Sequence, residues 1–158
     1  MNKKFSEYTF EDIEIGLSKE FEVIITESLV NDFAKVSGDY SPIHMDEIYA
    51  KSTTFKKRVV HGMLLGSFLS RVDGMYLPGK HALYFSQSVE FRSPCFIDDT
   101  VKVISKVIDK SESTKILKIE TTMYNQNNKI ILTGIGRVIV RDDWKFRYWD
   151  RYRKYWKI

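Results

Sequence analysis

Residues 62–77, GMLLGSFLSRVDGMYL, form the most continuously apolar long segment of the chain. Read as a helix, the segment carries large apolar side chains over most of its circumference, namely Met63, Leu64, Leu65, Phe68, Leu69 and Val72. A helix that is apolar on most sides is stable only when it is buried. Pro78 and Gly79 follow directly and are expected to end it. The segment therefore predicts one central helix that the rest of the fold must cover.

The strands predicted around this helix define the fold class. One segment, 19–25, precedes the helix, and four follow it, separated by the turn-forming sequences SPCFIDD, KSES and NQNN. These four are 81–91, 100–109, 114–125 and 129–140. Consecutive strands joined by short turns, with the helices grouped elsewhere, indicate an α+β protein. We expect an antiparallel sheet wrapped around the central helix, with an edge strand that pairs with a second copy of the chain.

Two shorter helices are predicted between the first strand and the central helix. Residues 27–36 carry apolar side chains at helical spacing, Thr26 precedes them as a candidate N-cap, and Gly38 follows the expected end. Residues 46–53 suit a second, short helix. No internal repeat, low-complexity tract or linker divides residues 1–140, so we expect them to form a single domain.

Composition excludes several classes of protein. The chain has 158 residues, 43% hydrophobic and 29% charged, which is ordinary for a globular domain. No stretch approaches the roughly 18 apolar residues that a membrane span requires, and the N-terminus lacks the apolar core of a signal peptide. The single cysteine, Cys95, allows no internal disulfide, and no Cys/His spacing indicates a metal site. The expected location is the cytoplasm.

Residues 37–45, SGDYSPIHM, place a carboxylate and an imidazole close together in a stretch too broken for a long helix. Asp39 lies five positions before His44, and Pro42 stands between them. One interpretation is a surface loop in which Asp39 caps a helix or turn. The other is an acid–base pair whose side chains the Pro42 kink directs into one pocket.

Two separated motifs resemble those of the MaoC-like, (R)-specific enoyl-CoA hydratase and dehydratase family. They are FAKVSGDYSPIHMDEIYA (33–50) and VVHGMLLGSFLS (59–70), and the similarity extends over residues 8–140. The resemblance implies a hot-dog fold, usually a homodimer with acyl-CoA pockets at the subunit interface. It implies Asp39 and His44 as the catalytic pair, the Gly62 N–H as oxyanion donor, and Ser70 as a polar group of the pocket. Ser41 replaces the usual asparagine before the proline, and Asp98 replaces a common turn glycine.

The implied reaction is reversible addition of water across a trans-2-enoyl thioester. Asp39 would hold and polarise the water, while His44 would complete the hydrogen bonds of this water and exchange a proton. The first N–H groups of the central helix have no intrahelical partner and would stabilise negative charge on the thioester oxygen. No metal or cofactor is expected. The substrate is an acyl thioester of CoA or of acyl carrier protein.

Several interpretations remain open at this stage. A non-catalytic acyl-binding or scaffold protein is the alternative from another functional class. FKKR (55–58) is either a site for CoA phosphates or a solvated loop. Ser70 either lines the pocket or bonds a carbonyl one turn back in its own helix. Arg71 and Asp73 are expected to be solvated or paired, and Cys95 to be a small core residue.

The C-terminal extension, 141–158, has a different composition. It holds seven Lys/Arg against three Asp, whereas residues 1–140 carry 18 charges of each sign. Seven aromatic residues include all three tryptophans, and most of the aromatics fall on one arc of about 140° if the segment is helical. We expect a helix that packs on this chain or on a partner subunit. A membrane contact is the less favoured alternative, and nucleic-acid binding is the least favoured.

Overall fold

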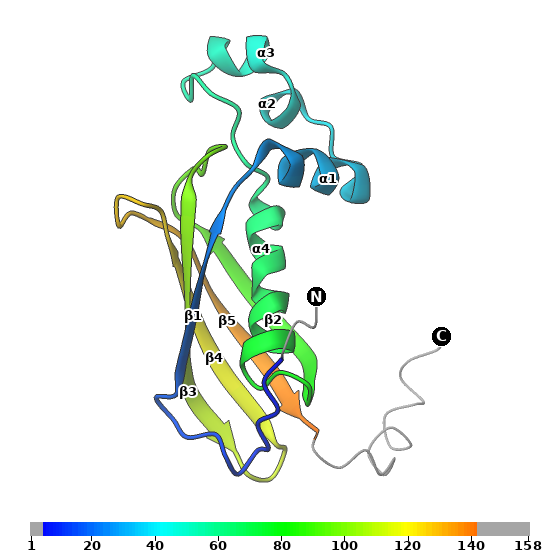
Figure 1. Ribbon diagram of the computed structural model, residues 1–158, viewed down its shortest axis with the longest axis vertical. Helices are drawn as coiled ribbons and strands as arrows, with labels where there is room; N and C mark the ends of the chain where they lie inside the picture. Colours follow the sequence, from blue (N-terminus) through cyan, green and yellow to red (C-terminus); the bar gives the residue numbers. More distant parts are fainter. Residues whose placement is uncertain (1–4, 142–158) are drawn as a thin grey trace.

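The computed structural model describes residues 5–141, and its centre is a five-stranded sheet in the order β1-β3-β4-β5-β2 (Figure 1). All neighbouring strands pair antiparallel. The strands are β1 (Ser18–Ile24), β2 (Ala82–Phe91), β3 (Thr100–Ser111), β4 (Ile116–Tyr124) and β5 (Ile130–Val140). The sheet confirms the predicted α+β class, and it leaves β1 and β2 as its two edges.

One helix lies across the sheet, and the others gather beyond the start of that helix (Figure 1). The long central helix is α4 (Gly62–Arg71), which continues into a π-helical turn, η1 (Val72–Tyr76). Beyond its N-terminal end lie α1 (Glu27–Ser37), α2 (Pro42–Met45) and α3 (Glu47–Ser52). This arrangement brings the Asp39–His44 segment to the end of α4 at which the helix begins.

Local sequence signals explain where the short helices begin and end. The Thr26 side chain accepts a hydrogen bond of 3.2 Å from the Leu29 N–H, and Gly38 ends α1 at φ 75°, as predicted. Asp46 caps α3 through a 3.0 Å bond from the Tyr49 N–H. The sequence did not predict α2, in which Pro42 takes a first-turn position that needs no N–H donor.

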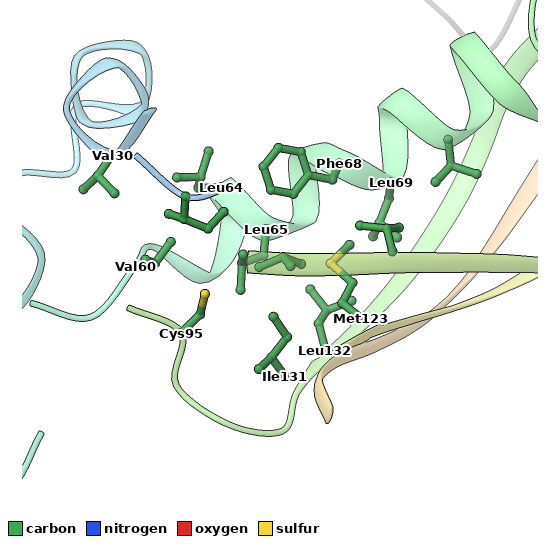
Figure 2. Packing of buried hydrophobic residues seen from close by; sticks show 14 residues of the cluster. Val30, Val60, Leu64, Leu65, Phe68, Leu69, Cys95, Met123, Ile131 and Leu132 are labelled. Carbon is green, nitrogen blue, oxygen red and sulfur yellow. The ribbon is translucent and has the colours of Figure 1, made fainter. Parts of the chain in front are cut away.

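The inward face of α4 forms the main hydrophobic core with the sheet (Figure 2). Leu64, Leu65, Phe68 and Leu69 are buried on this face. The residues that surround them come from both ends of the chain, including Val30, Val60, Cys95, Val101, Val103, Met123, Ile131 and Leu132. Each large apolar side chain contributes about 1.5–3 kcal/mol on burial. The opposite face of α4 remains uncovered in one chain, because Met63 is 59% exposed.

The central helix differs from the prediction at its C-terminal end. The sequence predicted one helix over 62–77, whereas the α-helix ends at Arg71 and a wider π-helical turn covers Val72–Tyr76. Leu77 is already extended, and its side chain enters a second core cluster with Phe10 and Ile13. The helix therefore changes its winding to carry the chain into this second cluster.

The four strands after α4 agree with the prediction to within a few residues. Asp98, where the family has a turn glycine, adopts a left-handed conformation with φ 71°, which aspartate tolerates better than most residues. Within residues 5–141 the structure contains no helix that is both long and apolar enough to cross a membrane. The predicted C-terminal helix falls in 141–158, of which only residue 141 belongs to the described part.

Asp73 contradicts the expectation that it is solvated or paired. It is only 5% exposed, and its Oδ2 atom has no hydrogen-bond partner among residues 5–141. Burial raises the pKa of this carboxyl to about 8 from an ordinary value of 3.8. The carboxyl is therefore mostly neutral at pH 7 in the folded state.

Stability should depend on pH through Asp73. The unfolded chain releases this proton near pH 4 and the folded chain near pH 8, so wild-type stability falls as pH rises between these values. Asp73→Asn cannot ionise, and we expect its melting temperature relative to wild type to rise steadily from pH 4 to pH 8. Thermal unfolding across this range measures the difference. Asp99→Asn is the control, because both carboxylate oxygens of this buried aspartate have partners. A difference between Asp73→Asn and wild type that stays constant with pH would contradict the assignment.

Candidate active site

A pocket of about 490 Å³ lies where α1, α2, the start of α4 and the segment after β2 meet. Three of the four predicted site residues line it, namely Asp39, His44 and Gly62. Most other lining residues are apolar, among them Phe33, Phe55, Val60, Leu65 and Phe91. The tertiary fold thus brings the two sequence motifs together around one cavity.

His44 enters the pocket from α2 with a defined tautomer. Its Nδ1 lies 2.7 Å from the carbonyl oxygen of Val59. A carbonyl oxygen can only accept, so Nδ1 carries the proton and donates it to this bond. In the neutral ring, Nε2 consequently holds a lone pair. A lone pair in this position can accept a proton or a hydrogen bond from a water molecule.

Asp39 is exposed in the single chain, and backbone groups hold it in place. One carboxylate oxygen, Oδ1, accepts a 3.1 Å hydrogen bond from the Ser41 N–H. The Asp39 N–H donates to Ser37 Oγ at 3.2 Å. The Ser41 side chain makes no helix-capping hydrogen bond. Because the contact from position 41 is made by its backbone, serine in place of the family asparagine still supports Asp39.

His61 is a site residue that the sequence analysis treated only as a helix-start residue. It is 2% exposed, and its ring nitrogen Nε2 donates to the Asp39 carbonyl oxygen at 2.9 Å. Its ring stacks on that of His44, with centroids 4.0 Å apart, and Phe33 packs against it at 5.1 Å. His61 makes no side-chain cap hydrogen bond to α4. Its role is to hold the Asp39–His44 segment against the start of the central helix.

Arg58 is a second support for the site. Its Nε donates to the His44 carbonyl oxygen at 2.6 Å, and its two terminal nitrogens donate to Glu27 and Asn31 of α1. The side chain is 13% exposed. The sequence predicted either a phosphate site or a solvated loop at 55–58, and Arg58 fits neither description. Lys56 and Lys57 of the same segment are exposed.

Gly62 begins α4, so its N–H and that of Met63 have no partner within the helix and carry positive partial charge. A Cβ atom at this position would lie 2.8 Å from the ring of Phe91. Glycine therefore allows the close approach of that ring, which would have to shift if a side chain replaced it. The N–H groups at the start of α4 lie at a pocket that both residues line, which suits stabilisation of an oxyanion.

Ser70 lies apart from these groups in the single chain. It is eight residues beyond Gly62, or about 12 Å further along the helix axis. The side chain is exposed, and it is not among the residues that line the pocket. The single chain therefore does not place Ser70 beside Asp39 and His44.

Asp39, His44 and His61 also present one ligand atom each within 4.8 Å of one another, a donor set that can hold a metal ion. The two imidazole planes are stacked at 30°. Because Nδ1 of His44 and Nε2 of His61 bond carbonyl oxygens, the opposite ring nitrogens are the ones that could face an ion or a water molecule.

Cys95 lines the same pocket but is not an activated nucleophile. It is 1% exposed and belongs to the main core, as predicted. Burial, with the nearby Asp99 carboxylate, raises the pKa of the thiol to about 12. The thiol is protonated at neutral pH and packs as a small apolar side chain.

Comparisons with known proteins identify the family of the chain. The MaoC-like domain model matches residues 11–129. An (R)-specific enoyl-CoA hydratase from Rhodospirillum rubrum is 39% identical over 83% of this chain and 90% of its own. A 3-hydroxybutyryl-CoA dehydratase from Methylorubrum extorquens is 35% identical over 83% of each chain.

The structural comparison leads to the same family. An unliganded R-hydratase from Pseudomonas aeruginosa superposes with a TM-score of 0.84 at 31% identity, over 88% of this chain and 89% of the other. The fold match confirms the expected hot-dog architecture, in which a curved antiparallel sheet wraps around one helix. Taken with the matched domain and the pocket built from both motifs, it shows that this chain belongs to the MaoC-like dehydratase family.

Proposed function

We propose that this protein adds water reversibly to trans-2-enoyl-CoA to form (R)-3-hydroxyacyl-CoA, with Asp39 and His44 as its acid–base pair. Membership of the family and its named hydratase and dehydratase relatives make the protein a hydro-lyase of acyl thioesters. The observation that carries the residue assignment is the pocket itself. There a carboxylate, an imidazole of fixed tautomer and the start of a helix meet.

Asp39 and the His44 Nε2 lone pair would bind one water molecule between them. The carboxylate accepts a hydrogen bond from this water and increases its nucleophilicity toward the β-carbon, while the imidazole exchanges a proton with it. Both groups act from one side of the double bond, which suits syn addition of water. In hydration, the pair takes one proton from the water and delivers one proton to the α-carbon, so that hydroxyl adds at the β-carbon. In dehydration, the pair removes the α-proton and protonates the β-hydroxyl, which leaves as water.

The start of α4 would stabilise the negative charge that develops on the thioester oxygen. The free N–H groups at Gly62 and Met63 donate hydrogen bonds, and the helix dipole adds positive potential. The apolar walls of the pocket strengthen these interactions by excluding water. These residues supply every proton and charge that the reaction needs, so the proposal includes no cofactor.

CoA is the proposed carrier, with acyl carrier protein as the alternative. Phe55 lines the pocket, and exposed Lys56 and Lys57 follow it directly. Two lysines beside the pocket favour binding of the CoA phosphates. The cytoplasm remains the proposed location, supported by the single, buried cysteine.

A homodimer is the proposed assembly. β2 forms one edge of the sheet, and it carries Tyr84, Phe85 and Phe91, which are 40%, 59% and 53% exposed. Pairing of two β2 strands would satisfy their unpaired backbone groups and bury these rings. It would also cover Asp39, which is exposed in a single chain. A second subunit is the proposed source of a polar group such as Ser70 near the reaction.

Substitution of either acid–base residue should abolish most of the activity. We expect Asp39→Asn and His44→Ala each to lower kcat for crotonyl-CoA hydration by about 10²–10⁴, because each removes a proton-transfer group. Loss of the enoyl-thioester absorbance measures the rate, and circular dichroism checks the fold. Near-normal kcat in either variant would refute the assignment. Wild-type protein that binds acyl-CoA without turning it over would favour the non-catalytic acyl-binding alternative.

His61 should act as a positioning residue. His61→Phe keeps a ring between Phe33 and His44 but removes the bond to the Asp39 carbonyl. We expect kcat to fall by about tenfold while KM changes little, since the loss of one hydrogen bond corresponds to about 1 kcal/mol or slightly more. His81→Phe is the matched control, because His81 also bonds a backbone carbonyl, that of Arg141. Equal effects of both variants on kcat would argue against this role.

The β2 edge should hold the dimer. Phe85→Lys places a charge at this edge, and we expect sedimentation to show monomers with greatly reduced hydratase activity. Ile24→Lys on the β1 edge is the matched control, since Ile24 and Phe85 are both 59% exposed. This control should remain dimeric. A fully active wild-type monomer at micromolar concentration would contradict the proposed assembly.

A further inference from the structure

One side of α4 carries a row of small residues that runs from the proposed oxyanion donor to Asp73. Gly62, Gly66 and Ser70 are spaced four residues apart, and Asp73 follows three residues later. At about 100° per residue the three α-helical positions fall within an arc of about 80°, and Asp73 follows in the π-helical turn η1. The row is about 16 Å long at 1.5 Å per residue. A Cβ atom on Gly66 would approach only the flexible side chain of Met63.

Strand β2 runs beside this row in the opposite direction. Phe91, at the end of β2, lies against Gly62. Tyr84 lies near the start of β2. Burial raises the pKa of its phenol, and the charge of the nearby Asp73 carboxylate raises it further. The two elements therefore border one strip, which we call the α4–β2 seam. It is defined on α4 and η1 by Gly62, Gly66, Ser70 and Asp73, and on β2 by Tyr84, Gln87 and Phe91. One end of the seam is the active-site pocket.

The other end of the seam holds an unpaired buried carboxyl group. Asp73 is 95% buried, and in the described part of the chain Oδ2 has no hydrogen-bond partner. Burial is the only cause of its raised pKa, so no described cation compensates its charge. Leaving such an atom without a partner is unfavourable, because nothing compensates for its loss of water. A buried carboxyl oxygen that meets no donor from residues 5–141 is a candidate for binding a donor from a ligand.

The Tyr84 hydroxyl, on the strand beside Asp73, already has another partner. The Tyr84 hydroxyl donates to Gln87 Oε1 at 2.6 Å, and Gln87 Nε2 donates to the Ser88 carbonyl at 2.7 Å. Gln87 lies against two glycines of β5. A Cβ atom on Gly134 would be 2.7 Å from Gln87 Nε2, and one on Gly136 would be 2.8 Å from Oε1. The glycines make room for the amide, and the amide oxygen accepts the Tyr84 hydroxyl proton.

We propose that the α4–β2 seam binds the acyl chain of the substrate, and that Asp73 recognises a hydroxyl or amino group near the far end of that chain. The inference rests on the proposed function, because it places the thioester carbonyl at Gly62. It adds a substrate class, namely acyl groups that carry a hydrogen-bond donor remote from the thioester. A plain alkyl chain would cover the carboxyl without giving it a partner, and sites of this kind discriminate strongly against such analogues.

Binding of saturated acyl-CoAs to the full chain tests the proposal without requiring turnover. Isothermal titration would compare octanoyl-CoA with its ω-hydroxy and ω-amino counterparts, and dodecanoyl-CoA with the same two derivatives. For wild type we expect at least one substituted chain to bind about tenfold more tightly than its plain parent, since a new hydrogen bond to the buried carboxyl contributes about 1 kcal/mol or more, which is close to a tenfold change in affinity. Asp73→Leu should reverse this preference. Asp73→Asn has nearly the same shape and should weaken ω-amino binding about tenfold.

The control variant is Ser67→Ala. Ser67 lies on α4 away from the seam, and its hydroxyl bonds the Leu64 carbonyl within the helix. We expect this variant to keep the wild-type preference. If Asp73→Leu fails to fold, Asp73→Asn alone decides the result.

Three outcomes would overturn the proposal: wild type that binds no acyl-CoA, equal affinities for plain and substituted chains, or a preference that persists in the Asp73 variants. Hydration of crotonyl-CoA by the same wild-type preparation keeps the two hypotheses apart. Normal hydration with equal affinities refutes only the role of Asp73. Absence of hydration refutes the proposed function, whatever the binding preference.

Discussion

Burial of one face of α4 against the sheet is the constraint on which the rest of the structure depends. Leu64, Leu65, Phe68 and Leu69 must leave water together, so the helix axis lies along the concave side of the sheet. Once the axis is placed, the first turn of the helix is also placed. The free N–H groups at Gly62 therefore sit at one fixed end of the core. A hydrophobic requirement thus positions the most polar part of the helix.

The acid–base segment depends on this helix through a few directional bonds. His61, immediately before α4, donates to the Asp39 carbonyl and stacks on His44. His44 in turn donates to Val59, and Arg58 binds the His44 carbonyl and α1. Each bond joins residues about 14 to 31 positions apart in the chain. They convert a short irregular segment into a rigid support, which acid–base chemistry requires.

Several apolar and proposed catalytic surfaces stay uncovered in the single chain. The outer face of α4, the aromatic edge of β2 and the exposed Asp39 all remain open to solvent. A second subunit on β2 would cover apolar rings and complete the surroundings of the site in one step. Asp73 is the reverse case, because the described residues bury it without giving Oδ2 a partner. Fold stability alone does not explain a buried, unpaired carboxyl, and this is why a role in ligand binding deserves a direct test.

Sequence by itself determined the elements whose signals are local. These signals act over a few residues: the apolar circumference of 62–72, the Thr26 cap, the Gly38 stop and the turns between strands. The structure places most of the corresponding elements within a few positions of the prediction. The two motifs also indicated Asp39, His44 and Gly62, which line one pocket. Tertiary structure alone decided the rest. Contacts between distant segments decide four features: the inward direction of Arg58, the bond from His61 to Asp39, the burial of Asp73, and the separation of Ser70 from the pocket. No local pattern encodes such contacts, because burial and hydrogen-bond partners are properties of the packed chain rather than of its neighbouring residues.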